Sequence, residues 1–135
     1  MSASWALQQA IFATLCTSDA IKDVVGDPPR VFDAPPRAAA FPYIVIGDDT
    51  MSDWSTATES GSEHTVVIHV WSRADGHRQA KLVADAVRDA LDGAALAVTG
   101  QALIDIRHIE TGFTRESDGE TTHGALRFRA VMEPV

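Results

Sequence analysis

The spacing of hydrophobic residues changes from every second residue to helical spacing within the segment from His64 to Leu91. Val66, Ile68 and Val70 alternate with other residues, which predicts a half-buried β-strand. After the turn Ser-Arg-Ala-Asp-Gly, apolar residues recur every three or four positions and predict one amphipathic helix. No catalytic pattern lies at the junction of the two elements. This combination favours an assembly module over an enzyme.

The main helix is expected from about Asp75 to Leu91. Ser72 with Asp75 fits a capping box, and Gly93 fits a C-terminal cap. An earlier helix, capped by Ser2 or Ser4, is expected to reach about Leu15, followed by a short helical turn capped by Ser18 and stopped by Gly26. A helix with two apolar sides either lies between other elements or meets a neighbouring subunit. Its two apolar stripes are Leu7, Ile11 and Leu15, and Trp5, Phe12 and Cys16.

Period-two patterns and turn residues predict the remaining strands. These strands are Arg30–Phe32 between two proline pairs, Tyr43–Ile46, about Leu103–Thr114 with Ile104, Ile106 and His108 on one face, and Ala125–Met132. Glu116–Glu120 contains Asp-Gly and is expected to be the tip of a hairpin. The order of elements predicts an α+β fold, in which an antiparallel or mixed β-sheet carries the N-terminal helix and the main helix.

The polar segment from Asp48 to Glu63 is either a long loop or a polar hairpin with a strand around Trp54 to Thr58. Loops longer than about 12–15 residues are uncommon unless they bind something or are disordered. Trp54 is therefore a candidate anchor, unless it folds back on its own domain. The hypothesis places Trp54 and the acidic residues Asp48, Asp49 and Asp53 in a docking loop that becomes ordered on contact.

Arginines on one sheet face form a second candidate interface. Arg127 and Arg129 are two residues apart on the last strand, and Arg107 can join them from the adjacent strand. Three guanidiniums in a chain of net charge −8 require carboxylate partners. These carboxylates belong either to the same chain or to an identical subunit, and the hypothesis favours the identical subunit.

Composition and motifs exclude several classes of function. A length of 135 residues suits one domain, and a net charge of −8 opposes sequence-independent binding to nucleic acid. Cys16 is the only cysteine, and it is expected to act as a small buried hydrophobe. The motifs of hydrolases, phosphate-binding loops and zinc proteases are missing, and the five histidines have no metal-ligand spacing. No catalytic residue, cofactor, metal site, signal peptide or membrane span is expected.

Four segments in order resemble a known family, the tail-terminator (tail-completion) proteins of long-tailed phages and gene transfer agents. They are PYIVIGDD at 42–49, HTVVIHVWSRADG at 64–76, AKLVADAVRDAL at 80–91 and THGALRFRAVMEP at 122–134. Each segment is weakly specific alone, whereas their order and spacing are hard to match by accident. The N-terminal helix and the proline-rich segment fit loosely, and residues 50–63 carry no motif of the family.

The resemblance implies that residues 1–135 form one tail-terminator-like domain, a subunit of a homohexameric ring. Such a ring caps the head-proximal end of a finished tail tube, stops its growth and offers a docking face to the head. Its implied partners are further copies of itself, the major tail tube protein and a head-completion or adaptor protein. DNA passes through the lumen without specific binding, and assembly takes place in the bacterial cytoplasm.

Two alternatives remain open from the sequence. Another head–tail adaptor or a tail-assembly chaperone would share the size and acidity but bind different partners. A small enzyme or ligand-binding α+β domain would require a deep pocket with convergent polar groups, for which the sequence has no signal.

Overall fold

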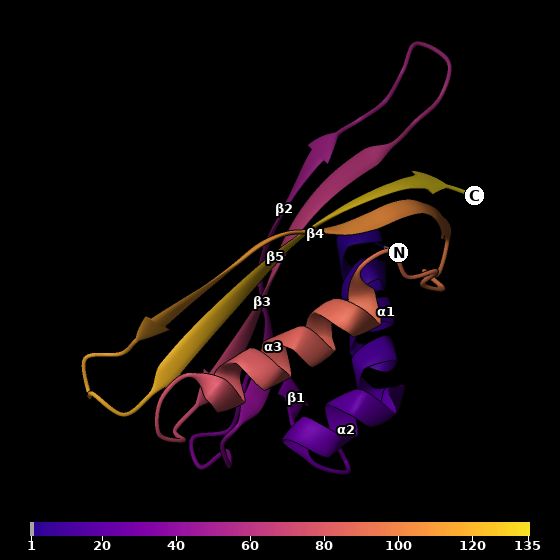
Figure 1. Cartoon of the computed structure of the whole chain (residues 1–135). Coiled ribbons are helices and arrows are strands. Elements are labelled where there is room, and N and C mark those ends of the chain that lie inside the picture. The colour runs from indigo at the N-terminus through magenta and orange to yellow at the C-terminus, as the bar shows by residue number, and fades with distance from the viewer. Residues whose placement is uncertain (1) are drawn as a thin grey trace.

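The computed structural model describes residues 2–135 and arranges them in two layers, a five-stranded sheet and three helices packed on one of its faces (Figure 1). The helices are α1 (Ala3–Thr17), α2 (Asp19–Val25) and α3 (Arg78–Leu91). The strands are β1 (Val31–Phe32), β2 (Tyr43–Asp53), β3 (Ser62–Ser72), β4 (Gln101–Arg115) and β5 (Thr122–Pro134). The α+β fold expected from the sequence is confirmed, with its N-terminal helix.

The strand order across the sheet is β1-β2-β3-β5-β4. β1 runs parallel to β2, and the other neighbouring strands are antiparallel, so the sheet is mixed. The β2–β3 and β4–β5 hairpins extend past the helices at opposite ends of the molecule (Figure 1). The molecule therefore reaches outward in two opposite directions.

Alternating strand residues build the hydrophobic core against the helices. Ile68, Leu126 and Phe128 are almost completely buried, and they belong to the same cluster as Leu7 and Ile11 of α1. Burying one such side chain contributes roughly 1.5–3 kcal/mol. In the part of the chain that the structure describes, no helix covers the opposite sheet face, which is called the open face below.

The serines expected to cap the first helices do so. Ser2 Oγ accepts a backbone N–H of the first turn of α1 (3.3 Å), and Ser18 Oγ accepts the N–H of Ile21 (3.3 Å). Gly26 ends α2 with a φ of +94°, a conformation that side chains disfavour. α1 itself continues two residues beyond the expected end, to Thr17.

The predicted start of the main helix is wrong by three residues. α3 begins at Arg78 rather than Asp75, and no side chain caps it. Ser72 cannot cap the helix because it is the last residue of β3, where its hydroxyl donates to Gln79 Oε1 (2.6 Å). The turn at Gly76, with a φ of +70°, separates the strand from the helix.

The polar segment after the predicted strand Tyr43–Ile46 is a hairpin rather than a long loop. β2 continues to Asp53, which pairs with Ser62 at the end of the ladder. The strand predicted around Trp54 to Thr58 is wrong, because these residues form the turn that connects β2 to β3.

Two β-bulges change the pattern of exposure along β4. The register against β5 shifts between Leu103 and Asp105, and again between His108 and Glu110. An extra residue in one strand leaves the regular alternation of faces. Ile104, predicted to share a face with Ile106, is therefore half exposed, whereas Ile106 is fully buried.

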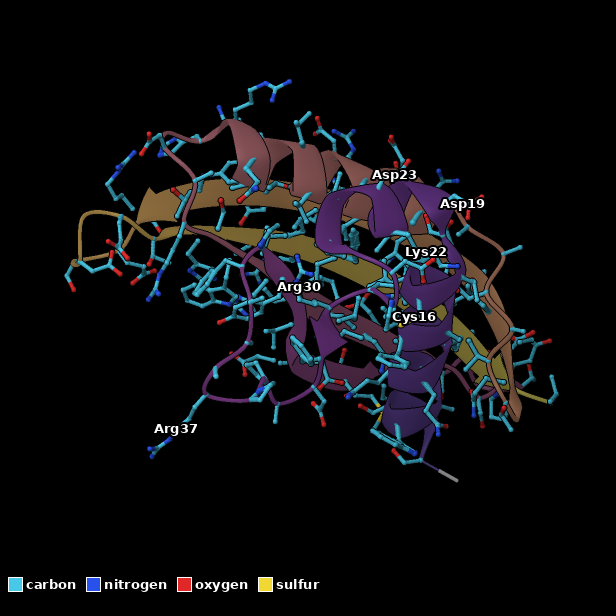
Figure 2. All side chains as sticks on the ribbon, turned by 90° about the horizontal axis from the view of Figure 1, so that it is seen from below. Cys16, Asp19, Lys22, Asp23, Arg30 and Arg37 are labelled. Carbon is cyan, nitrogen blue, oxygen red and sulfur yellow. The ribbon has the colours of Figure 1, made fainter. Side chains whose placement is uncertain are left out.

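Arg30 attaches the proline-rich segment to the sheet. Its Nε donates to the Pro42 carbonyl (3.0 Å), and the β1 pairing of Val31 with Ile44 follows immediately. Figure 2 shows Arg30 lying between α2 and the strands, whereas Arg37 points away from the molecule. The sequence predicted this short edge strand, and the structure confirms it.

Candidate interaction surfaces

Three arginines lie together on the open face, as their spacing predicted. Arg127 and Arg129 project from β5, and Arg107 of β4 lies directly opposite Arg129 in the ladder. Each guanidinium has a carboxylate of the same chain nearby. The ion pairs are Arg129–Glu63 (2.6 Å), Arg107–Asp105 (2.9 Å) and Arg127–Glu110 (3.7 Å).

These ion pairs are at the surface and contribute little to folding. The arginine side chains are 40–62% exposed, and pairs of this kind contribute about 0–1 kcal/mol each. The intramolecular pairing that the sequence left open is thus present in the single chain. Because the arginines remain accessible, pairing with a second subunit stays a hypothesis.

The β2–β3 hairpin carries the other predicted residues, and these residues make different contacts. They are Asp48, Asp49, Asp53 and Trp54. Asp49 accepts a hydrogen bond from Ser4 of α1 (2.5 Å), which ties the hairpin to the helical layer. Asp53 accepts from the Ser55 hydroxyl (2.6 Å) and backbone N–H (3.2 Å), and these bonds lower the pKa of its carboxyl. Asp48 is exposed and lies on β2, before the turn.

Trp54 lies at the start of the hairpin turn. Its backbone N–H donates to Gly61 (3.0 Å), and its ring packs so closely on Gly61 that a Cβ there would lie 3.3 Å from the ring. The side chain is nevertheless 47% exposed. Both sequence interpretations therefore apply in part, since the ring rests on its own hairpin and still offers an apolar face.

Glu63 supplies the ionic contact between the hairpin and the arginines. Glu63 is the second residue of β3. Its carboxylate accepts from Arg129 Nε (2.7 Å) and lies 2.6 Å from Arg129 Nη2. Trp54 and Asp53 lie beyond this point, toward the tip of the hairpin. The predicted residues consequently lie in three places. Asp53 and Trp54 are at the hairpin tip, Asp48 and Asp49 are farther down β2, and the arginines are on the open face.

An aromatic and imidazole cluster on the open face was missed. His69 Nδ1 lies 2.6 Å from His123 Nε2, and the Trp71 ring stacks on His123 at 4.1 Å. Glu116, in the opposite hairpin, lies 3.6 Å from His123 Nδ1. Burial, and then the neighbouring His69, lower the pKa of His123. The sequence placed His69 and Trp71 on one face but gave no sign of which strand supplies His123.

The sequence also did not predict a groove beside α1, although it did predict the second apolar stripe of this helix, which borders the groove. Leu7, Ile11 and Leu15 are buried, whereas Trp5 and Phe12 are 48% and 44% exposed. Trp5 and Phe12 border an open groove of about 420 Å³. Its walls are Trp5, Gln8, Gln9, Phe12, Asp33 and Ile46.

Two further titratable side chains, His64 and Cys16, are buried or half-buried. His64 is fully buried on the helical side of β3, with Nε2 bonded to Ser62 (2.9 Å) and Nδ1 without a partner. Cys16 is half-buried against the core near Lys22 of α2 (Figure 2), and burial raises the pKa of its thiol. Residues 2–135 contain no group of three or more potential ligands arranged to hold a metal ion.

No helix within residues 2–135 has both the length and the apolar character needed to cross a bilayer. The surfaces with the most notable chemistry are thus an open sheet face, an extended hairpin and a shallow groove. Such surfaces are suited to contact with other macromolecules.

Comparison with known proteins identifies the family. A model of the family described as tail completion protein gp17 matches residues 9–133. The chain is 27% identical over 127 residues to tail completion protein gp17 of Bacillus phage SPP1, covering 94% of this chain and 92% of that protein. The chain therefore belongs to the gp17 family of tail completion proteins, which confirms the resemblance seen in the sequence.

Solved structures agree with this assignment. A chain in the virion of a native gene transfer agent particle has a TM-score of 0.90 and 31% sequence identity, covering 98% of both chains. The structure of bacteriophage SPP1 gp17 has a TM-score of 0.63 and 25% identity, covering 95% of this chain and 89% of that one. One of these relatives is a tail completion protein of a phage, and another is a chain of a gene transfer agent virion.

Proposed function

We propose that residues 1–135 act as one structural unit, a subunit of a homohexameric ring at the head-proximal end of a phage-like tail tube. The ring stops growth of the tube and provides the face to which the head docks. Its partners are further copies of this chain, the major tail tube protein and a head-completion or adaptor protein. The ring assembles in the bacterial cytoplasm and remains in the finished particle, and it has no catalytic role.

The observation that carries this proposal is the match to a chain of a gene transfer agent virion over 98% of both proteins. The match includes both long hairpins as well as the helical layer, because almost the whole of each chain is aligned. A protein that joins a tube to a head needs contact surfaces pointing in two directions. The hairpins at opposite ends of this molecule meet that requirement (Figure 1).

The charge of the chain also suits a passage for DNA. A net charge of −8 gives the ring wall a repulsive interaction with phosphate. DNA can then move through the lumen without binding to it.

The β2–β3 hairpin tip is proposed as a docking element. Trp54 supplies a half-exposed apolar face, and the adjacent Asp53 adds negative charge. Asp48 lies farther from the tip, along β2. Large aromatic residues commonly dominate the binding energy of an interface. Hydrogen exchange at residues 54–61 should slow in assembled particles relative to the free protein. Identical exchange in the two states would remove this hairpin from the interface.

Deletion of the gene tests the main proposal. Electron microscopy of the deletion strain should show tails of uncontrolled length separated from filled heads, and a plasmid copy should restore normal particles. Tails of normal length that fail to join heads would indicate a head–tail adaptor instead. Absence of tails would favour a tail-assembly chaperone, and normal particles would refute a role in the particle.

A further inference from the structure

Large exposed apolar residues gather at two opposite edges of the sheet. One group is Trp5 and Phe12, which border the α1 groove beside β1 and β2. The other group is Ile104 and Ile109 of β4, which are 50% and 51% exposed. The strand order places β1 and β4 at the two ends of the sheet. The chain thus has a groove on one edge and apolar projections on the other.

The backbone of β4 is closed to strand addition at its centre. Gly93 donates its N–H to the Ile106 carbonyl (2.8 Å), and Asp92 Oδ1 accepts the N–H of His108 (3.0 Å). The two bulges flank this closed section and further disfavour pairing with another strand. The isoleucines that the bulges expose are therefore available for side-chain contact, not for extension of the sheet.

The two edges offer one pair of opposite charges. Asp33 is an exposed carboxylate in the wall of the groove, and it forms no ion pair within the described chain. Arg88 of α3 lies next to His108 and Thr111 of β4 and forms no ion pair within residues 2–135. Three carboxylates line the same surface of α3, those of Asp85, Asp89 and Asp92. Asp33 beside the groove and Arg88 beside the projections can therefore pair when the two edges meet, while the apolar side chains supply the contact area.

We propose that the α1 groove of one copy of this chain receives Ile104 and Ile109 of the next copy, with Asp33 facing Arg88. This inference rests on the proposed ring and names its subunit contact. A contact between two different faces is heterologous, and repeated rotation closes it into a ring. A two-fold contact of groove with groove would instead place Asp33 against Asp33 and leave Ile104 and Ile109 exposed.

Cysteine cross-linking tests this contact directly. In a Cys16→Ser background, Gln9→Cys places a thiol in the groove and Ile109→Cys places one on β4. Particles carrying both substitutions and treated with a short bismaleimide should give a ladder of covalent oligomers on a denaturing gel. Either single variant should give no oligomers, and a mixture of the two single variants should stop at dimers.

The outcomes separate this contact from the proposed function. Normally capped tails without a ladder would overturn the contact and leave the function intact. Oligomers from a single-cysteine variant would also overturn it, because they would indicate a two-fold contact. The deletion experiment tests the function independently.

Charge reversal gives a second test that does not depend on cross-linking chemistry. Asp33→Arg and Arg88→Asp should each reduce the yield of capped tails at least tenfold, and the double variant should restore most of it. Leu82→Ser removes a half-exposed apolar side chain outside both surfaces and serves as the control. Failure of the double variant to recover, with normal circular dichroism, would refute the pairing.

Discussion

A single buried histidine gives the fold a dependence on pH. Burial lowers the pKa of His64 below its usual value of 6.5, and the nearby Asp49 carboxylate opposes this shift only in part. Below pH 6.5 the unfolded chain therefore binds a proton that the folded chain excludes. The stability from neutral His64 is fully present above pH 6.5 and is lost as the pH falls from 6.5 toward the folded pKa. His123 acts in the same direction.

Replacement of His64 by leucine should flatten this dependence. The variant removes the unpartnered Nδ1 and keeps a similar volume, so its stability at pH 7.5 should change by less than about 1.5 kcal/mol. Urea unfolding between pH 7.5 and 5 should show a smaller loss of stability for His64→Leu than for the wild type. The variant His77→Gln, which changes a histidine outside the core, controls for net charge. Parallel curves for His64→Leu and the wild type would contradict the assignment.

Gly47 allows His69 to lie across β2. A Cβ at Gly47 would come within 2.4 Å of His69 Cδ2, so Gly47→Ala must displace the imidazole from His123. Gly47→Ala should destabilise the protein by about 1–3 kcal/mol in the wild type, and by less than about 1 kcal/mol in a His69→Ala background.

The matched control is Gly112→Ala, also in a strand of the sheet. No atom lies within 4 Å of a Cβ at Gly112, so this substitution should change the stability by no more than about 0.5 kcal/mol. Equal costs for Gly47→Ala with and without His69 would show that the backbone, and not the imidazole, limits this position.

At the scale of elements, alternation and helical spacing predicted the existence of almost every helix and strand, but not their limits. Ser72 has the chemistry of a helix cap, yet its place in the β3 ladder prevents that role. The bulges at Ile104 and Ile109 depend on the register against β5, and local sequence does not encode that register. Helix caps such as Ser18, in contrast, were predictable because the interaction is local.

For the candidate surfaces, too, local spacing was predictable from the sequence, whereas contacts between distant segments were not. Arg127 and Arg129 share a face because they are two residues apart on one strand. Glu110 faces Arg127 across the predicted β4–β5 hairpin. Glu63 is 66 residues away from Arg129 in sequence, and only the tertiary fold brings these two together. The stacking of Trp71 on His123 was missed for the same reason.

The closed edge of β4 is an element-scale feature that can be measured. Asp92→Ala removes the acceptor of the His108 N–H and should increase the exchange rate of that amide about fivefold, which corresponds to one hydrogen bond of about 1 kcal/mol. Amide exchange measured by NMR would report this change residue by residue. Asp89→Ala, on an exposed face of α3, should leave the His108 amide unchanged. Equal effects of the two variants would indicate general loosening of α3.

At the scale of the whole molecule, the arginines of the open face distinguish an internal role from a role in assembly. If Arg129 serves only its own chain, the double substitution Glu63→Arg with Arg129→Glu keeps the ion pair and should preserve both folding and assembly. If Arg129 also faces a carboxylate of another subunit or of the tube, the exchange preserves folding but places like charges across the interface.

We expect the second result, because a surface pair contributes at most about 1 kcal/mol to folding, whereas like charges across an interface cost several kcal/mol. Thermal unfolding should show a melting temperature near that of the wild type, and electron microscopy should show few joined particles. The single variant Arg129→Glu is a poorer test, since it also places two carboxylates together within the chain. A swapped variant that assembles at the wild-type yield would assign Arg129 to its own sheet alone and leave the edges as the surfaces that build the ring.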